Sequence, residues 1–167
     1  NVTNFSYVSG TAYCLSWLIK PGTGNFWQVN FSSTRFPTNC YANFSLSAGA
    51  YTIGAGADAA GIEVYANGWA LIWVAGTCNV SGTTTCGSLY NVTAITSAYR
   101  QIFTATNASC TVWAPQMEAG TFPTSRILTT TAAVTRAADV VSLTGATATA
   151  ALAAKSAYFE TSRCSNP

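Results

Sequence analysis

Apolar and polar residues alternate in short stretches through the first 120 residues of the chain. In the stretch AYCLSWLIK, the alternate residues Tyr13, Leu15, Trp17 and Ile19 would share one face of a β-strand, and PGTG ends the stretch. The stretch WALIWVA at 69–75 is apolar on both faces, which is typical of a central strand. Further strands are predicted at 26–31, 41–46, 50–53, 62–65, 88–95, 99–105 and 109–118.

Turn residues separate these strands, as in the ANG at 66–68, where glycine suits a positive φ. Many short antiparallel strands with turns between them indicate an all-β fold, an antiparallel β-sandwich. A jelly roll is the variant that we expect. We therefore place a β-sandwich domain at 1–120.

The pattern changes at Gly120. Residues 121–141 contain prolines and threonines with little periodicity, so the sequence predicts an extended C-terminal arm. Further along the chain, the sequence predicts a strand at 139–145, an Ala-rich helix at 146–155 and a strand at 156–162. These elements are too few to bury a core of their own. We assign 121–167 to an arm for exchange between subunits, and a short subdomain packed on its own sandwich is the alternative.

Charged residues make up only 7% of the 167 residues, against about 25% in an ordinary globular domain, while 49% are hydrophobic. Such hydrophobicity argues against a disordered chain. The formal net charge of +2 is too small to attract nucleic acid or an anionic membrane. No apolar run reaches the roughly 18 residues that a membrane helix needs. We therefore expect no nucleic-acid partner and no insertion into a membrane.

The chain has no histidine, which excludes the usual Ser–His and Cys–His nucleophiles. Its five carboxylates are dispersed, so that only folding could bring Glu63 near Glu118 for acid–base chemistry. No glycine motif of the kind that cradles phosphate is present. We expect no metal, no cofactor and no catalytic residues, and hence no enzyme.

Six cysteines occupy positions 14, 40, 78, 86, 110 and 164, and no two of them form a CxxC motif. We expect an oxidised, extracellular framework, with buried free thiols as the alternative. Cys78 and Cys86 flank a loop rich in Gly, Thr and Ser, and they are the predicted disulfide; the other pairings stay open. Because the chain begins at Asn1, we expect that a secretion signal, if the protein is exported, has already been removed.

Seven of the eleven asparagines lie in Asn-Xaa-Ser/Thr sequons. In FWQVNF and YANFSL the alternation would place Asn30 and Asn43 on the polar, outward face of their strands. Outward asparagines of this kind can accept N-linked glycans. The alternative is that they form the polar strand faces of a β-protein rich in Thr and Asn. The predicted glycosylation sites are Asn1, Asn4, Asn30, Asn43, Asn79, Asn91 and Asn107.

Four motifs follow one another along the chain: Asn67-Gly68-Trp69, Trp113-Ala114-Pro115-Gln116-Met117-Glu118-Ala119-Gly120, Pro123-Thr124-Ser125 and Thr135-Arg136-Ala137-Ala138-Asp139. In this order the chain resembles the jelly-roll, carbohydrate-binding-like module of bacteriophage tail and head fibre proteins. The resemblance implies a virion fibre protein whose sandwich binds sugar. The chain departs from that family at Ala70-Leu71, where Tyr-Arg is usual, and in its many cysteines and sequons.

Carbohydrate binding needs an aromatic platform with a few amide or carboxylate partners. Trp27 and Tyr65 lie near turns and are the better exposed aromatic residues, whereas Trp73 and Trp113 are expected in the core. Core packing is the alternative for every aromatic residue. The candidate carbohydrate-binding residues are Trp27, Gln28, Tyr65, Trp69, Gln116 and Glu118.

The predicted strand KSAYFETS at 155–162 cannot pair within a completed sandwich, so its backbone groups favour the sheet edge of a neighbouring subunit. We expect self-association into a fibre or trimer through 121–167. Together these features predict a non-enzymatic structural and adhesive module of a virion fibre or another extracellular fibre, which recognises surface glycan. The alternative is a glycosylated subunit of an extracellular cell-surface filament, assembled by exchange of the C-terminal arm.

Overall fold

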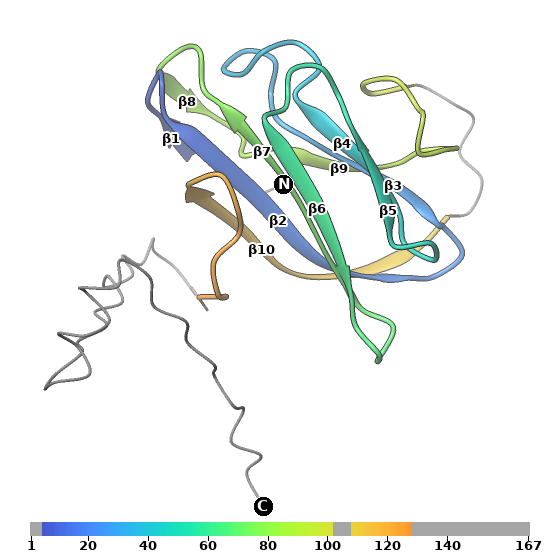
Figure 1. Ribbon diagram of the computed structural model, residues 1–167. Coiled ribbons are helices and arrows are strands. Elements are labelled where there is room, and N and C mark those ends of the chain that lie inside the picture. Colours follow the sequence, from blue (N-terminus) through green and yellow to red (C-terminus); the bar gives the residue numbers. More distant parts are fainter. Residues whose placement is uncertain (1–4, 102–107, 128–167) are drawn as a thin grey trace, which may run out of the picture. The chain divides into compact units, whose positions relative to one another are not determined.

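A computed structural model describes residues 5–101 and 108–127 (Figure 1). These residues form ten β-strands and no helix, and every strand pairing is antiparallel. The all-β fold with antiparallel sheets is confirmed. The strands are β1 (Phe5–Tyr7), β2 (Ala12–Pro21), β3 (Phe26–Asn30), β4 (Tyr41–Ser45), β5 (Ala50–Ile53), β6 (Ala59–Val64), β7 (Ala70–Thr77), β8 (Gly82–Thr84), β9 (Ser88–Asn91) and β10 (Cys110–Ala119).

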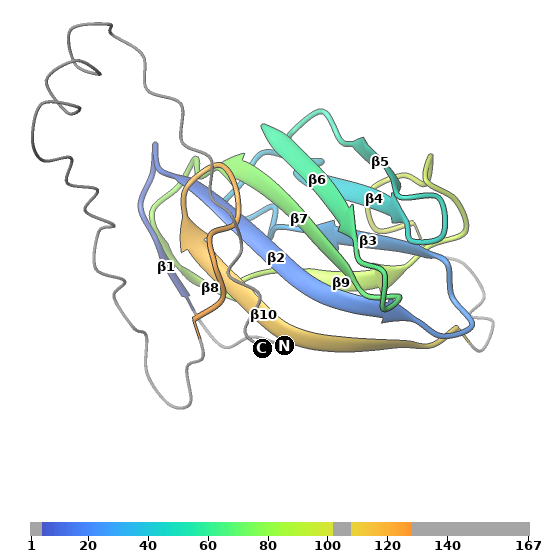
Figure 2. The ribbon, with the colours of Figure 1, turned by 60° about the horizontal axis from the view of Figure 1, so that its bottom comes forward.

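Two four-stranded sheets form the two layers of the domain (Figure 1). One sheet has the strand order β10-β2-β7-β6, and the other has the order β5-β4-β3-β9. The edge strands β5 and β6 pack against each other on one side of the domain. Figure 2 shows the other two edge strands, β9 and β10, along the opposite side. A short two-stranded ribbon of β1 and β8 completes the described strands.

The hydrophobic core lies between the two layers. The alternation predicted for β2 is confirmed, since Tyr13, Leu15 and Ile19 are buried and Trp17 is partly buried against the same core. The facing sheet contributes Trp27, Val29, Ala42 and Phe44. A shift of one residue would turn the apolar set of a strand to the outer face of its sheet, so the buried inner faces fix the register of both sheets.

Aromatic rings fill the part of the core beside β1. Phe31 stacks on Phe36 with 4.1 Å between the ring centroids, and the ring of Tyr7 meets those of Tyr13 and Phe36 edge-on. Stacked and edge-to-face pairs of this kind follow from the ring quadrupole. The buried Tyr7 hydroxyl donates a hydrogen bond to Cys86 O at 2.9 Å. The ribbon of β1 and β8 is therefore attached to the core through this tyrosine.

A loop at 92–101 covers the outer face of the β5-β4-β3-β9 sheet. Gln28 and Asn43 point to this face, yet they are only 0% and 1% exposed. Gln28 Nε2 donates to Asn43 Oδ1 at 2.8 Å and to Ala98 O at 2.9 Å. In return, Arg100 N donates to Gln28 Oε1 at 2.8 Å. The loop therefore takes its hydrogen-bond partners from the polar row of the sheet.

Asn43 is bound by the same loop, because its Nδ2 donates to Ile95 O at 3.0 Å and to Ser97 O at 2.7 Å. Asn30, on the same face of β3, is 0% exposed. Asn30 and Asn43 thus lie on the outer face of their sheet, as predicted, but the prediction that they are exposed there to accept a glycan is wrong. Alternation separates the two faces of a strand, but it does not show which segment covers the polar face. Residues 99–101, predicted to begin a strand, belong to this covering loop.

β10 ends at Ala119, and Gly120 follows it with a φ of 144°, a value that is unfavourable for other residues; the chain then reverses its direction. Residues 121–127 return to the outer face of the β10-β2-β7-β6 sheet and form hydrogen bonds with it. The first part of the predicted arm at 121–167 is thus attached to the sandwich. The rest of that arm, with its predicted elements at 139–162, lies outside the described residues.

Candidate functional site

The outer face of the β10-β2-β7-β6 sheet is apolar along its middle. Residues in register on antiparallel strands point to the same side of a sheet. Leu18 of β2 is in register with Trp113 of β10 and with Leu71 of β7, so these three side chains form one row. Trp113 is 53% exposed, and the two leucines are half-buried. A large indole is thus presented to solvent at the β10 end of an apolar row.

Trp73 belongs to the next row, in register with Gly61 of β6 and Ser16 of β2. A Cβ atom at position 61 would lie 2.6 Å from the indole Nε1, so only glycine allows this ring to pack over the β6 backbone. Beyond it, Tyr65 N donates to Trp69 O at 2.8 Å and closes the β6–β7 hairpin. We call the whole surface the aromatic face, and it consists of Leu18, Tyr65, Trp69, Leu71, Trp73 and Trp113.

A polar network borders the aromatic face along β10. Glu118 accepts hydrogen bonds from Gln116 Nε2 at 2.9 Å, from Thr124 N at 2.9 Å and from Thr124 Oγ1 at 2.5 Å. At the other end of the Gln116 amide, Oε1 accepts a hydrogen bond from Ile127 N at 3.1 Å. The returning segment 121–127 therefore holds both side chains in one orientation. Groups fixed in this way lose little conformational entropy when they bind a ligand.

Arg126 adds a positive charge to this network. Its Nη1 donates to Ser16 Oγ at 3.1 Å and to Ala114 O at 2.7 Å. Burial lowers the pKa of the guanidinium, and the neighbouring Glu118 and Tyr65 oppose that shift. The Nη2 atom is buried and has no hydrogen-bond partner among the described residues. The network therefore joins a fixed carboxylate, an amide and a guanidinium on one side of the sheet.

A β-bulge in β10 brings the aromatic and polar parts to the same face. The register with β2 shifts between Trp113 and Gln116, and Ala114 has a φ of 45°. In a regular strand, two residues three positions apart point to opposite faces. Here Trp113 and Gln116 pair with Leu18 and Ser16, which share a face, because the extra residue resets the alternation. The bulge also directs the Ala114 carbonyl to Arg126.

Four of the six predicted carbohydrate-binding residues lie on or beside the aromatic face, namely Tyr65, Trp69, Gln116 and Glu118. The other two belong to the second sheet. Trp27 points into the core, is 7% exposed and donates from Nε1 to Gly24 O at 3.0 Å. Gln28 is enclosed by the loop at 92–101. The expectation that Trp27 and Gln28 can reach a ligand is therefore wrong, since proximity to a turn does not give exposure.

Trp113, Trp73 and Arg126 are the residues of this site that the sequence did not indicate. Both tryptophans were expected in the core, and both point to the outer face. Pro115 could have indicated that Trp113 points outward, because a proline within a strand marks a bulge or an edge strand. Arg126 reaches the site only because the chain reverses after Gly120, which no local pattern predicts.

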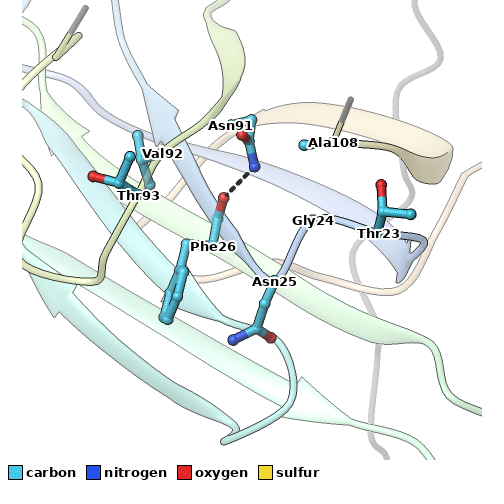
Figure 3. A pocket seen from close by; sticks show the side chains of 8 residues that line it. All are labelled: Thr23, Gly24, Asn25, Phe26, Asn91, Val92, Thr93 and Ala108. Atoms are coloured by element: carbon cyan, nitrogen blue, oxygen red, sulfur yellow. Dashed lines mark hydrogen bonds between the residues drawn. The ribbon is translucent and has the colours of Figure 1, made fainter. Parts of the chain in front are cut away.

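The sequons of the described residues differ in exposure. Asn79 is exposed, Asn30 and Asn43 are buried, and Asn91 is half-buried. Asn91 Nδ2 donates to Phe26 O at 3.0 Å (Figure 3). N-glycosylation modifies the side-chain amide nitrogen of asparagine, so this nitrogen must reach solvent to accept a glycan. Three predicted sites lie outside the described residues: Asn1, Asn4 and Asn107.

Of these four sequons, we expect the exposed Asn79 to be glycosylated when the chain is secreted from a host that performs N-glycosylation. Glycopeptide mass spectrometry measures the occupancy of each site. Replacing Asn79 with glutamine should remove one glycan mass from the intact protein. A glycan on the peptide that contains Asn43, found in folded and secreted protein, would contradict the burial of this side chain.

A hollow of about 320 Å³ lies between the β2–β3 loop, the end of β9 and Ala108 (Figure 3). Two asparagine amides on its wall already form hydrogen bonds within the protein. Asn25 Nδ2 donates to Ser45 Oγ at 3.2 Å, and Asn91 Nδ2 donates to Phe26 O. These amides hold the loop in place, so we assign the candidate ligand site to the aromatic face and not to this hollow.

Five of the six cysteines fall in the described residues, and no disulfide links them there; Cys164 lies outside. The predicted disulfide between Cys78 and Cys86 is not formed. Cys78 Sγ donates to Val80 O at 3.3 Å, and the Tyr7 hydroxyl binds the backbone oxygen of Cys86. Both thiols are buried in this arrangement.

Two other thiols, those of Cys14 and Cys40, are 0% exposed, and burial raises the pKa of each to about 12. They are therefore protonated at neutral pH. Within residues 5–101 and 108–127, no group of three or more His, Cys, Asp or Glu side chains could hold a metal ion.

Comparisons with known proteins add no relative from which a function could be transferred. No protein-family model matches this chain, and no curated protein is similar enough to count as a homologue. Among the described residues there is also no helix with the length and apolar character needed to cross a membrane.

Proposed function

We propose that this chain is a non-enzymatic structural and adhesive module of an extracellular fibre, on a virion or on a cell, and that its aromatic face recognises surface carbohydrate. The resemblance to the jelly-roll module of phage fibre proteins supports this choice. The two antiparallel sheets are compatible with a jelly roll. The low content of charged residues suits close packing of identical modules in a fibre.

The exposure of Trp113 beside a fixed polar network carries the proposal. Binding sites for small polar ligands combine aromatic surface with a few well-placed polar groups. Trp113 supplies a ring that is 53% exposed. Gln116 and Glu118 are oriented by the segment 121–127, and Arg126 lies next to them. A sugar ring stacked on the indole would find hydroxyl partners on the same face of β10.

We expect the Trp113→Ala variant to bind its glycan about tenfold more weakly or worse, because the loss of a central tryptophan contact costs about 1.4 kcal/mol or more. A glycan array identifies the sugar, and titration calorimetry then measures the dissociation constant. Phe122→Ala is the matched control, since Phe122 is 62% exposed but lies in the turn after β10. Wild-type protein that binds no sugar at millimolar concentration would refute the adhesive role.

A second candidate is a glycosylated subunit of an extracellular cell-surface filament, assembled by exchange of the C-terminal arm. The edge of β10 favours it. This ten-residue strand pairs with β2 on one side, and no backbone group of the described residues pairs with its other side. An unpaired strand edge is a template for a strand from a neighbouring chain.

A further inference from the structure

We propose that the side of the sandwich between β9 and β10 is an acceptor site for residues 155–162 of a second copy of this chain. This inference rests on the assembled form of the proposed fibre. It goes further because it identifies the surface that receives the arm, the strand that is donated and the side chains that meet.

The two sides of the sandwich differ. On one side, β5 and β6 pack against each other and close the gap between the layers. On the other side, β9 is the last strand of its sheet and β10 is the last strand of the other sheet (Figure 2). No strand of the described residues bridges β9 and β10. We call this side the open seam.

Apolar side chains that point inward along the open seam are incompletely covered. Val112 of β10 is in register with Ile19, which is fully buried, yet Val112 is 43% exposed. Met117, further along β10, is only partly buried against the core. From the other layer, Leu89 of β9 is in register with the buried Val29 and is itself only partly buried. A further strand laid along the seam would cover all three.

Trp17 gives an independent observation at the same place. This residue points into the core from β2, the strand next to β10, and it lies opposite the bulge at Ala114. Its indole Nε1 is buried and has no acceptor among the described residues. Buried donors in proteins are almost always paired. An inserted strand would bring backbone carbonyl groups, and one of these could accept a hydrogen bond from the Trp17 indole N–H.

The free edge of β10 limits where the inserted strand can pair. Pro115 has no N–H group, and the bulge interrupts the edge at this point. Regular backbone pairing is therefore available on the run 110–113, next to the hollow of Figure 3, and on the run 116–119. The exposed Val112 belongs to the first of these runs, which we take as the principal contact.

The segment 155–162, KSAYFETS, has the pattern that the open seam requires. In a strand, Ala157 and Phe159 point to one side, so that Phe159 would enter between the layers while its polar neighbours face outward. The segment has one lysine and one glutamate, so it carries no net charge into the seam. A donated strand of this kind supplies main-chain hydrogen bonds along the edge and a side-chain anchor in the core.

Chain length and the exit point favour a second copy as the donor. The described chain ends at Ile127, whose N–H is fixed to Gln116 Oε1 on the outer face of the sheet, opposite to the inward-pointing Val112. The link from Ile127 to Lys155 can extend to about 90 Å at roughly 3.3 Å per residue. That reach is sufficient for a neighbouring module in a fibre.

Two full-length variants test the proposal, one with a blocked acceptor and one with a blocked donor. Val112→Glu places a charge in the seam, and Phe159→Glu places one in the donated segment. We expect each variant alone to be monomeric by light scattering, whereas wild-type chain assembles. An equimolar mixture should form a dimer of one copy of each, because each variant retains the half that the other has lost.

Thr111→Glu is the matched control, since Thr111 is exposed on the same run of β10 and points to the outer face; it should assemble like wild type. Circular dichroism checks folding, and Val112→Asn replaces Val112→Glu if the latter unfolds.

If the mixture stays monomeric, the segment acts within its own chain and the inference fails. If both variants assemble like wild type, the open seam is not the acceptor, although the fibre function stands. A wild-type chain that is monomeric at every concentration would refute the fibre function itself.

Discussion

Replacing Asn43 with leucine should destabilise the domain by about 2–4 kcal/mol, because each lost hydrogen bond costs about 0.5–1.5 kcal/mol and a buried acceptor left without a donor costs more. The Asn43 amide donates to Ile95 O and Ser97 O, and its Oδ1 accepts from Gln28 Nε2. Leucine has a similar shape but forms none of these three hydrogen bonds, so Ser97 O loses its donor, while Gln28 Nε2 and Ile95 O each keep one other partner. Urea denaturation measures the free energy of unfolding, and the midpoint of thermal unfolding should fall by roughly 10–20 °C.

Asn30→Leu is the matched control for this prediction. Asn30 is also a buried sequon asparagine on the same sheet, at 0% exposure, but neither its Nδ2 nor its Oδ1 has a partner among the described residues. Leucine removes an amide that is desolvated without compensation, so stability should stay the same or rise by about 1 kcal/mol. If both variants lose stability equally, the contacts of Asn43 do not hold the covering loop.

These two asparagines show that alternation in a sequence separates the two faces of a strand but does not show which face is buried. The pattern in β3 and β4 correctly separated an apolar set, which includes Val29 and Phe44, from a polar set. It could not show that the polar set is also buried, because the covering loop at 92–101 contacts it through long-range hydrogen bonds. β3 and β4 were therefore predictable from local sequence, and the loop that lies outside them was not.

The candidate site shows the same limit more sharply. Gln116 and Glu118 were identified because amides and carboxylates are suitable partners for a sugar, and the structure places them beside exposed aromatic surface. Trp113 was assigned to the core because it lies inside an apolar strand. A bulge of one residue was sufficient to reverse that assignment. An irregularity in the backbone, and not the composition of the strand, thus determines which side chains form the site.

The aromatic face and the open seam meet at β10, so the proposed sugar site and the proposed assembly contact share one strand. The outer side of this strand carries Trp113 and Glu118, and its inner side carries Val112 and Met117. A strand that pairs with the free edge would stiffen the bulge on which Trp113 stands. Assembly of the proposed fibre would then preorganise the proposed sugar site, since fixed groups bind with a smaller entropic cost.

The domain should lose stability steeply between pH 9 and pH 12 in the presence of a reductant. Burial raises the pKa of the Cys14 and Cys40 thiols from 9.0 to about 12. In the unfolded chain both thiols ionise near pH 9, whereas the folded protein keeps them neutral. Their contribution to stability is therefore complete below pH 9 and is lost as the pH rises toward 12. At pH 11 the loss amounts to about 5 kcal/mol for the two thiols together.

The Cys14→Ala, Cys40→Ala double variant separates this effect from other causes. Removal of two buried thiols changes packing equally at every pH, so the variant should start with lower stability at pH 7 but lose much less than wild type between pH 7 and pH 11. Urea denaturation at the two pH values gives both differences. An equal loss in the two proteins would assign the alkaline transition to other groups, such as Tyr7, whose pKa burial also raises.

Because the chain has no histidine, no side chain with an ordinary pKa near neutrality titrates, and stability should change little between pH 6 and pH 8.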